Sequence, residues 1–290
     1  MNSISICYHA DCTDGWTSAW VALQYFNACG THFADIELVP VQHGKSHPAI
    51  KPGTIVYYLD FFPGCMKLLE VAKTAKSVVV LDHHATAKKE LDDYNQFGKQ
   101  LPSDISVVFS DKMSGALLTW TYLRPYDKPP ALVSYVSDND IWAHKLPNSR
   151  EVAAYVQSHN HTVVDWDYLS QLSDQELILR SSEVWRVKQN NAILSAKNAY
   201  EKTIHCNGKD QLAAVVNVSF PLTQDTLAKL LETYVFAIGY SRTSDGKWKI
   251  SARSKDQSKI TAQEFCESMQ GGGHRNASGA TVECTPLYLL

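Results

Sequence analysis

Four groups of residues that could bind a metal ion stand at the ends of predicted secondary-structure elements. Three groups follow predicted strands over residues 3–8, 54–60 and 77–82. The fourth follows an apolar helix over 130–137. In chain order the groups are His9, Asp11, Cys12 and Asp14; Asp60; Asp82, His83 and His84; and Asp138 and Asp140. One such group arises easily by chance, but four at successive element ends indicate a single site.

The donor atoms of these groups define the chemistry. Carboxylates and imidazoles with almost no thiolate suit Mn²⁺ or Mg²⁺ better than structural Zn²⁺. Two such ions about 4 Å apart can clamp both oxygens of an in-line phosphoryl displacement and ionise a bridging water. The sequence therefore predicts a two-metal site for phosphoryl chemistry, with Mn²⁺ as the expected ion and Mg²⁺ as the other candidate.

A second polar cluster is the run GGGHRNASG over residues 271–279. One glycine is enough to end a helix, whereas three let bare backbone approach a ligand with N–H groups directed at an anion. In the predicted strand KWKISAR, over 247–253, apolar and polar residues alternate. Arg253 therefore lies on the open face, where it could clamp a phosphate. A flexible linker and a solvated strand face are the alternative readings of these two features.

The order of the predicted elements indicates an α/β protein with a mainly parallel sheet and helices on both faces. Helical segments alternate with strands over residues 3–8, 36–41, 54–60, 77–82 and 105–109. Ligands bind at the carboxyl ends of the strands in such a sheet, and the metal-binding residues stand there.

A long polar helical stretch separates this sheet from a second strand pattern. Ser173 and Glu176 have the spacing of a capping box, and neither Gly nor Pro occurs from there to about residue 203. A strand over 212–218 and a hairpin signal at Asp245-Gly246 follow. We expect three parts: a metal-binding catalytic domain over 1–180, a helical connector over 181–205, and a smaller α/β substrate-binding domain over 206–290.

Composition limits the class of protein further. Of the 290 residues, 44% are apolar and 20% are charged, which excludes global disorder. The formal net charge of −3 argues against a protein that coats long nucleic acid. The sequence contains no apolar run of transmembrane length, no basic leader before Asp11, and seven scattered cysteines without a CxxC pair. We expect a cytoplasmic protein with reduced thiols that binds neither membranes nor long duplexes.

The motifs, taken in order, resemble those of DHH phosphoesterases. The N-terminal ones are HxxCxDG at 9–15, YLD at 58–60, DHH at 82–84 and SDNDIW at 137–142. The run GGGHRNASG, with Arg253 upstream, resembles a DHHA1 domain. The resemblance covers nearly the whole chain and is nearest to the stand-alone, bilobal group that includes nanoRNases and pAp-phosphatases.

The resemblance implies a role for each matched residue. The first metal site would use His9, Cys12 and Asp60, and the second Asp14, Asp60, His83 and Asp138, with Asp60 bridging. His84 would face the scissile phosphate, Asp82 would orient its neighbours, and Asp140 would support or replace Asp138. The substrate would be bound by Arg253, Gly272, Gly273 and His274.

One position departs from the family pattern. Many members have Asp where this chain has Cys12, in a turn that is one residue shorter here. Three alternatives are open: Asp11 compensates, Cys12 binds the ion directly, or the first site binds its ion weakly.

The leading hypothesis is a metal-dependent phosphoesterase that hydrolyses short single-stranded oligonucleotides, pAp or cyclic dinucleotides, in the manner of an oligoribonuclease or exonuclease. An exopolyphosphatase or pyrophosphatase is the second hypothesis, and it predicts indifference to bases. A nucleotide sensor that binds without cutting is the third, and Cys12 is the feature that keeps it open.

Overall fold

The computed structural model describes residues 3–45, 47 and 49–283. The chain divides into two compact units, Met1–Val184 and Trp185–Leu290. Each unit has its own sheet and its own hydrophobic core, and each is described separately below.

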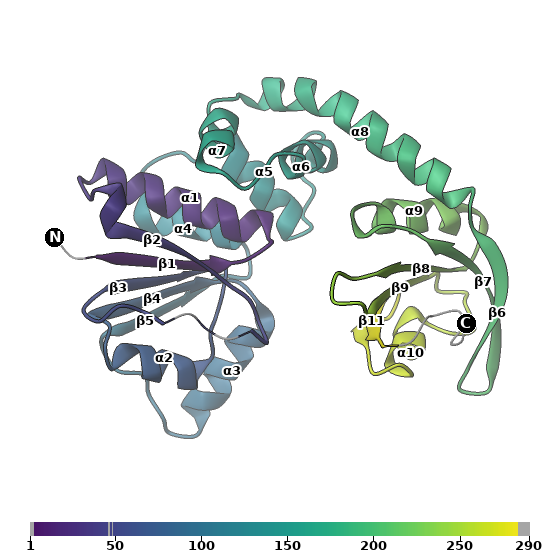
Figure 1. Ribbon diagram of the computed structural model, residues 1–290, viewed down its shortest axis with the longest axis horizontal. Helices are drawn as coiled ribbons and strands as arrows, with labels where there is room; N and C mark the ends of the chain where they lie inside the picture. Colours follow the sequence, from purple (N-terminus) through teal and green to yellow (C-terminus); the bar gives the residue numbers. More distant parts are fainter. Residues whose placement is uncertain (1–2, 46, 48, 284–290) are drawn as a thin grey trace. The chain divides into compact units, whose positions relative to one another are not determined.

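A five-stranded parallel sheet forms the centre of the N-terminal unit (Figure 1). Its order is β2-β1-β3-β4-β5, and all neighbouring strands are parallel. The strands are β1 (Ile4–His9), β2 (Ile36–Val41), β3 (Ile55–Leu59), β4 (Ser77–Asp82) and β5 (Ile105–Phe109). This arrangement confirms the α/β class predicted from the alternation of strands and helices.

Helices cover both faces of this sheet, which explains the near-continuous apolar strands. Helices α1 (Thr13–Ala28) and α4 (Gly115–Leu123) lie on one face, and α2 (Cys65–Ala72) and α3 (Ala85–Gln96) on the other (Figure 1). A short 3₁₀ turn, η1 (Phe33–Asp35), precedes β2. Three further helices pack near α1 and α4: α5 (Ala131–Asp140), α6 (Ser149–Gln157) and α7 (Val163–Ser170).

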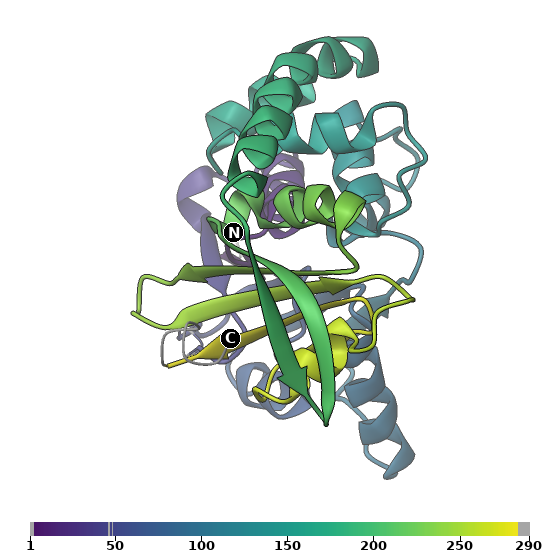
Figure 2. The same cartoon turned by 90° about the vertical axis from the view of Figure 1, so that its right-hand side faces the viewer.

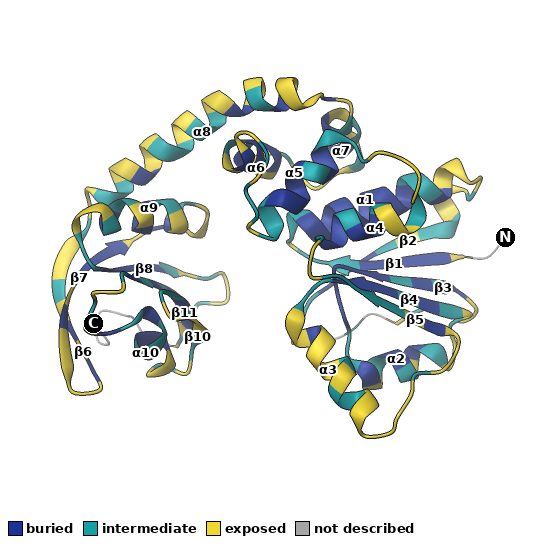
Figure 3. Ribbon diagram, turned by 180° about the vertical axis from the view of Figure 1, so that it is seen from behind, coloured by how far each residue is buried: buried dark blue, intermediate teal, exposed yellow. Residues whose placement is uncertain are grey.

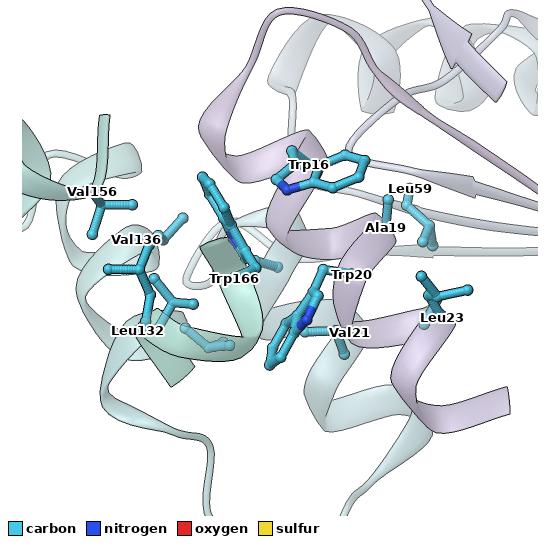
Figure 4. Packing of buried hydrophobic residues seen from close by; sticks show 14 of the residues in the cluster. Trp16, Ala19, Trp20, Val21, Leu23, Leu59, Leu132, Val136, Val156 and Trp166 are labelled. Carbon is cyan, nitrogen blue, oxygen red and sulfur yellow. The ribbon is translucent and has the colours of Figure 1, made fainter. Parts of the chain in front are cut away.

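Three tryptophans join α1 to α7. Trp16, Trp20 and Trp166 are buried in one cluster (Figure 4). The indole N–H of Trp166 donates to Thr17 Oγ1 at 2.9 Å, and that of Trp20 donates to Asp167 at 2.8 Å. These bonds satisfy the polar atoms of large side chains and so fix α1, whose first turn carries metal-site residues.

A six-stranded mixed sheet, ordered β10-β11-β9-β8-β7-β6, forms the C-terminal unit. Only β7 and β8 run parallel among its paired neighbours in the described residues. Helices α9 (Phe220–Thr233) and α10 (Ala262–Glu267) pack on it, and Figure 2 shows its long β6–β7 hairpin. The strands are β6 (Tyr200–Cys206), β7 (Lys209–Asn217), β8 (Phe236–Arg242), β9 (Trp248–Ser254), β10 (Gly272–His274) and β11 (Ala277–Val282).

Helix α8 (Asp174–Ala196) begins with the expected capping box. The backbone N–H of Ser173 donates to Glu176 Oε2 at 2.8 Å, and the N–H of Glu176 donates to Ser173 Oγ at 3.3 Å. Much of the helix surface is exposed or half-buried (Figure 3), in agreement with its polar sequence.

The structure differs from the expected helical connector over 181–205 in its last part. The helix ends at Ala196, and the residues from Tyr200 onward form β6. Buried and exposed residues alternate in this segment, as in a strand. Ile204 and Cys206, two residues apart, both pack in the core of the second unit.

Six cysteines lie in the described residues, and all six are free thiols. The seventh, Cys284, lies outside the described residues. Within the described residues, none of the helices combines the length and apolarity needed to span a membrane.

Candidate metal centre

Most of the residues that the sequence predicts to bind metal gather at the carboxyl edge of the N-terminal sheet. Strand β1 ends at His9, Asp60 follows β3, and β4 ends at Asp82. These three strands are neighbours in the sheet. Helix α1 adds Asp14 from its first turn, and α5 ends at Asp140. Elements far apart in the sequence therefore bring their polar ends to one place.

Asp60 lies at the centre of this group, with only 1% of its surface exposed. Its Oδ1 is 3.0 Å from His83 Nε2, and its Oδ2 is 3.4 Å from His9 Nδ1 and 3.5 Å from Cys12 Sγ. Burial opposes ionisation, but the hydrogen bond from His83, the close contact with His9 and the positive charge of His84 hold the pKa of Asp60 well below its usual range. Asp60 thus offers one oxygen to each of two neighbouring groups, as a bridging ligand must.

Asp14 is a buried carboxylate with one oxygen unused. Its Oδ1 accepts hydrogen bonds from Ser114 Oγ and from the backbone N–H of Ala116 at 3.0 Å. Its Oδ2 is buried without a hydrogen-bond partner and lies 3.9 Å from His83 Nε2. Burial, and then the charge of Asp60, raise the pKa of Asp14 well above its usual range. Such a carboxylate is stabilised by a cation.

His83 lies between carboxylates from three different elements. Its Nε2 is 3.3 Å from Asp140 Oδ2, in addition to its contacts with Asp60 and Asp14. Burial lowers the pKa of His83, but its hydrogen bond to Asp60 and the negative charges of Asp60 and Asp140 outweigh this effect and raise the pKa. Asp140 is therefore part of the cluster.

Asp138, the expected ligand from this motif, is placed elsewhere. Its Oδ1 accepts from the backbone N–H of Lys145 at 2.9 Å, and its Oδ2 accepts from that of Leu146 at 3.1 Å. Both carboxylate oxygens therefore hold the loop after α5. The geometry favours Asp140 over Asp138 as the ligand from this segment.

Asp82 fixes the two histidines that follow it. Its Oδ1 accepts from the backbone N–H groups of His83 and His84, at 2.7 and 3.3 Å, and lies 2.7 Å from His84 Nδ1. This hydrogen bond, against the opposing effect of burial, raises the pKa of His84 to about 9. The His84 ring is thereby held through Nδ1, which leaves Nε2 available to another group.

Cys12 and Asp11 have different surroundings. Burial, and then the charge of Asp60, raise the pKa of the Cys12 thiol, so the neutral S–H donates to Asp60. Asp11 instead accepts a hydrogen bond from Gln42 at 3.3 Å. Among the described residues, Asp11 belongs to none of the metal-binding clusters, so the geometry favours Cys12 over Asp11 as the third donor beside His9.

The donor set fits divalent cations. In each of three groups, one donor atom per residue lies within 4.8 Å of the others. His9 Nδ1 and Asp14 Oδ2 are also buried without hydrogen-bond partners in the described part of the chain. A buried polar atom without a partner is costly, and a bound cation would remove that cost. The groups are His9, Cys12 and Asp60; Asp14, His83 and Asp140; and Asp60, Asp82, His83 and His84.

Two glycines, Gly15 and Gly115, let the backbone of their helices pack closely against residues of the metal centre. A Cβ on Gly15 would lie 2.3 Å from the carbonyl oxygen of His9. A Cβ on Gly115 would lie 2.5 Å from Asp60 Cβ and 2.9 Å from Asp14 Oδ2. The sequence marked Gly15 within a motif, but it gave no signal for Gly115, whose role depends on how α4 packs at this edge.

A cavity of about 320 Å³ adjoins the centre. The His43 ring stacks on Phe61 at 4.3 Å and lies 6.0 Å from the ring of His9. Two lysines give the cavity a basic lining, which suits an anionic ligand. These residues belong to none of the motifs found in the sequence, although the run QHGKSH over 42–47 contains a lysine and two histidines. The lining is Val41, Gln42, His43, Gly44, Lys45, His47, Phe61, Pro63 and Lys67.

In the C-terminal unit, strand register places Arg253 and His274 in one row. Arg253 pairs with Ala277 across β9 and β11, and Ala277 pairs with His274 across β11 and β10. Residues directly opposite each other point to the same face of a sheet. Arg253 and His274 therefore share a face, with the small Ala277 between them and a separation of about 10 Å over two strand spacings. Burial lowers the pKa of Arg253, and its Nη1 donates to the carbonyl of Ala252 at 2.9 Å.

The three consecutive glycines have different roles. A Cβ on Gly271 would lie 2.3 Å from the carbonyl oxygen of Gly279, and one on Gly273 would lie 2.7 Å from that of Ala277. Gly273 also has φ +144°. Packing therefore requires two of the glycines, whereas a Cβ on Gly272 would meet no atom within 4 Å. Only at Gly272 does the structure leave space for a ligand to approach the backbone.

Comparison with known proteins agrees with these observations. Residues 212–285 match the DHHA1 domain family. An uncharacterized protein of Acanthamoeba polyphaga mimivirus is 26% identical over 291 residues, which cover 94% of this chain. The chain spans 66% of the length of that relative.

Two solved structures share the fold across nearly the whole chain. An exopolyphosphatase-related protein from Bacteroides fragilis has a TM-score of 0.51 at 11% identity, covering 99% of this chain and 89% of its own. The pGpG-specific phosphodiesterase PggH from Vibrio cholerae has a TM-score of 0.50 at 12% identity, covering 99% of this chain and 95% of its own. At these identities the likeness concerns the fold.

The parallel sheet with its carboxylate and histidine cluster, together with the mixed second sheet, defines a two-unit α/β protein with a candidate metal centre. The C-terminal unit contains a DHHA1 domain over residues 212–285, and the four N-terminal motifs resemble those of DHH phosphoesterases.

Proposed function

We propose that this chain hydrolyses phosphoester bonds in short nucleotides, such as short single-stranded oligonucleotides, pAp or cyclic dinucleotides, with bound divalent metal ions. The observation that carries the proposal is the position of Asp60, whose two buried carboxylate oxygens lie beside His83 and beside His9. A carboxylate shared between two groups of donor atoms can hold two ions close together, as two-metal catalysis needs.

In this proposal, the ions are Mn²⁺ or Mg²⁺, because the donors are oxygens and imidazoles with a single thiol. When bound, they stabilise charge on the phosphoryl oxygens and lower the pKa of an attacking water. The first ion would be held by His9, Cys12 and Asp60, and the second by Asp14, Asp60, His83 and Asp140.

The chain's own residues orient the reacting groups. Asp82 holds His84 through Nδ1 at 2.7 Å, so His84 Nε2 is the nitrogen that can donate a hydrogen bond to the scissile phosphate. The half-exposed His84 ring, with 39% of its side chain exposed, is open to such a ligand. Asp82 is a positioning residue in this scheme, because it acts through His84 and the adjacent backbone.

The C-terminal unit binds a substrate phosphate through Arg253, His274 and the backbone at Gly272. The shared face of Arg253 and His274 and the open space at Gly272 support this role. A guanidinium gives two parallel charge-assisted hydrogen bonds to a phosphate. Gly273 contributes through the backbone conformation that it permits.

A second candidate function is the hydrolysis of inorganic polyphosphate. The basic cavity beside the centre, with Lys45 and Lys67, favours it, because such a lining binds phosphates without reading a base. A third candidate is a nucleotide sensor, and the neutral Cys12 thiol favours it, because a site without its usual carboxylate binds a cation less strongly.

A substrate panel tests the three candidates. Purified protein would be assayed with a dinucleotide, pAp, a cyclic dinucleotide and polyphosphate, each with Mn²⁺, Mg²⁺ or EDTA. Nucleotide turnover that EDTA abolishes supports the proposal. Turnover of polyphosphate alone supports the second candidate, and nucleotide binding without turnover supports the third.

The matched control is Asp60→Asn, which keeps the shape of the side chain and removes its charge. Loss of activity with an unchanged thermal melt in EDTA would assign the activity to this centre. Full activity in the folded variant would show that a contaminant or another site is responsible.

A further inference from the structure

The loop after α5 is held in place by one residue. The backbone carbonyl of Asp138 accepts from the N–H groups of Ala143 and His144, at 3.0 and 3.2 Å. Its carboxylate accepts from the N–H groups of Lys145 and Leu146. Asp138 therefore receives hydrogen bonds from four consecutive residues, which fix the conformation of the loop.

The same loop is strained. Trp142, His144 and Asn148 have φ values of +55°, +46° and +53°. These values lie in the left-handed region, which residues other than Gly, Asn and Asp rarely adopt. A bulky Trp in this conformation is a clear exception. Strain of this kind persists only where the surrounding bonds enforce it, and it is concentrated at ligand-binding sites.

The loop also holds a large apolar ring in solvent. Trp142 is 64% exposed, which is unfavourable for an indole. Its ring lies 5.4 Å from that of His144, and Arg150 Nε donates to His144 Nδ1 at 3.2 Å. The indole thus rests against a neighbour that is itself fixed.

Trp142 differs in position from the other strongly exposed aromatic residues of its unit. It lies two residues after Asp140, whose carboxylate is 3.3 Å from His83. Phe97 and Tyr126, which are 80% and 98% exposed, follow helices that begin at the metal-binding edge and lead away from it. Helix α5 leads back to that edge, so its terminal loop lies beside the cluster.

We propose that Trp142 is the surface on which a base of the substrate stacks, and that Asp138 positions it. The inference rests on the proposed nucleotide phosphoesterase function and narrows it to substrates that carry a base next to the scissile phosphate. Stacking on an aromatic side chain accepts any base and needs an exposed, rigid ring. The strained and exposed Trp142 meets both conditions.

The test compares a dinucleotide with the same dinucleotide lacking one base. The variants are Trp142→Phe, Trp142→Gly and, as a remote control, Tyr126→Ala. Trp142→Gly should lower kcat/KM on the dinucleotide about five- to hundredfold, while Trp142→Phe and Tyr126→Ala stay within a few-fold of wild type. Two abasic analogues are possible, each lacking one of the two bases. On the analogue that lacks the stacked base, wild type and Trp142→Gly should have equal kcat/KM.

Two further measurements separate stacking from folding and from catalysis. Glycine tolerates φ +55°, so Trp142→Gly should not lower the unfolding temperature. Calorimetric titration with the dinucleotide in EDTA measures binding without turnover, and Trp142→Gly should weaken it by a similar factor.

Equal dinucleotide binding by wild type and Trp142→Gly would overturn the inference, whether or not turnover occurs. So would an equal loss on both abasic analogues, or a large drop in unfolding temperature, because Trp142 would then be structural. Binding that depends on Trp142 in a protein without turnover would retain the inference and reject the proposed catalytic function.

Discussion

The carboxylate of Asp140 lies 3.3 Å from Nε2 of His83, across the edge of the N-terminal sheet. Asp138, two residues earlier on the same helix, directs both of its carboxylate oxygens to backbone N–H groups of the following loop. The two acidic residues of this motif therefore have separate roles: Asp140 belongs to the candidate metal centre, and Asp138 fixes the conformation of the following loop.

The first prediction separates these tasks. Asp140→Asn should weaken Mn²⁺ binding by at least about tenfold and leave the unfolding temperature in EDTA nearly unchanged. Asp138→Asn should lower the free energy of unfolding by about 1.5–3 kcal/mol, because it loses hydrogen bonds to a charged acceptor. Calorimetric Mn²⁺ titration and thermal melts measure the two effects. Loss of Mn²⁺ binding in a stable Asp138→Asn variant, with normal binding by Asp140→Asn, would restore Asp138 as the ligand.

The second prediction concerns Cys12. Its Sγ lies 3.5 Å from Asp60 Oδ2, so a carboxylate at this position would add negative charge beside the proposed first ion. Cys12→Asp should tighten metal binding about tenfold or more, because close charges in a half-buried site interact by on the order of a few kcal/mol. It should also destabilise the protein in EDTA, because like charges then repel.

Cys12→Ser is the matched control, since it is close in size and neutral, and it should bring no gain in affinity. The measurement is the increase in unfolding temperature with added Mn²⁺. Weaker metal binding by Cys12→Asp than by wild type would show that the sulfur is a better ligand than a carboxylate at this position.

The third prediction concerns phosphate binding by the C-terminal unit. Arg253→Ala should lower kcat/KM on a dinucleotide about ten- to hundredfold, since each charge-assisted hydrogen bond contributes about 1.5–3 kcal/mol. His274→Ala should also lower kcat/KM. The double variant should lose less transition-state stabilisation than the two single variants added together, because both residues act on one phosphate. Metal affinity should not change.

Arg275→Ala is the control for a general loss of positive charge next to His274. It should have little effect, because Arg275 is outside the row formed by Arg253, Ala277 and His274. Full kcat/KM in Arg253→Ala would remove the C-terminal unit from substrate binding.

Strand order explains how much of the site could be predicted from the sequence. The apolar runs that end at His9 and Asp82 are buried strands, and the rules for parallel sheets place their carboxyl ends together. The choice between Asp138 and Asp140 could not be predicted, because it depends on the left-handed turn after α5. Gly115 was missed for a similar reason, since its closeness to Asp60 arises from packing between separate elements.

The fourth prediction uses two adjacent glycines with different surroundings. Gly273→Ala should destabilise the protein by about 1–3 kcal/mol, because φ +144° and a contact of 2.7 Å with the carbonyl oxygen of Ala277 both exclude a Cβ. Gly272→Ala should leave the unfolding temperature unchanged, since a Cβ there meets no atom within 4 Å. A raised KM in the stable Gly272→Ala variant would indicate that a ligand approaches this backbone. An unchanged KM would mean that the glycine run serves only the hairpin.

The last prediction concerns stability against pH. Glu264 completes a capping box with Thr261 at the start of α10 and lies 3.0 Å from Lys209 Nζ. Hydrogen bonds from Thr261 and the contact with Lys209 lower the pKa of Glu264 from 4.5 to about 2. The folded state therefore favours the charged carboxylate, and the unfolded chain takes up this proton first as the pH falls. The stabilisation is complete above pH 4.5 and is lost progressively toward pH 2.

Glu264→Gln should lower the free energy of unfolding by about 0.5–1 kcal/mol at neutral pH, the usual contribution of an exposed cap and ion pair. The difference from wild type should shrink as the pH falls from 4.5 to 2. Lys209→Met removes only the ion pair and should therefore have a smaller effect. Urea unfolding at several pH values measures this dependence. A constant difference between wild type and Glu264→Gln over the whole range would show that the charge of Glu264 does not stabilise the fold.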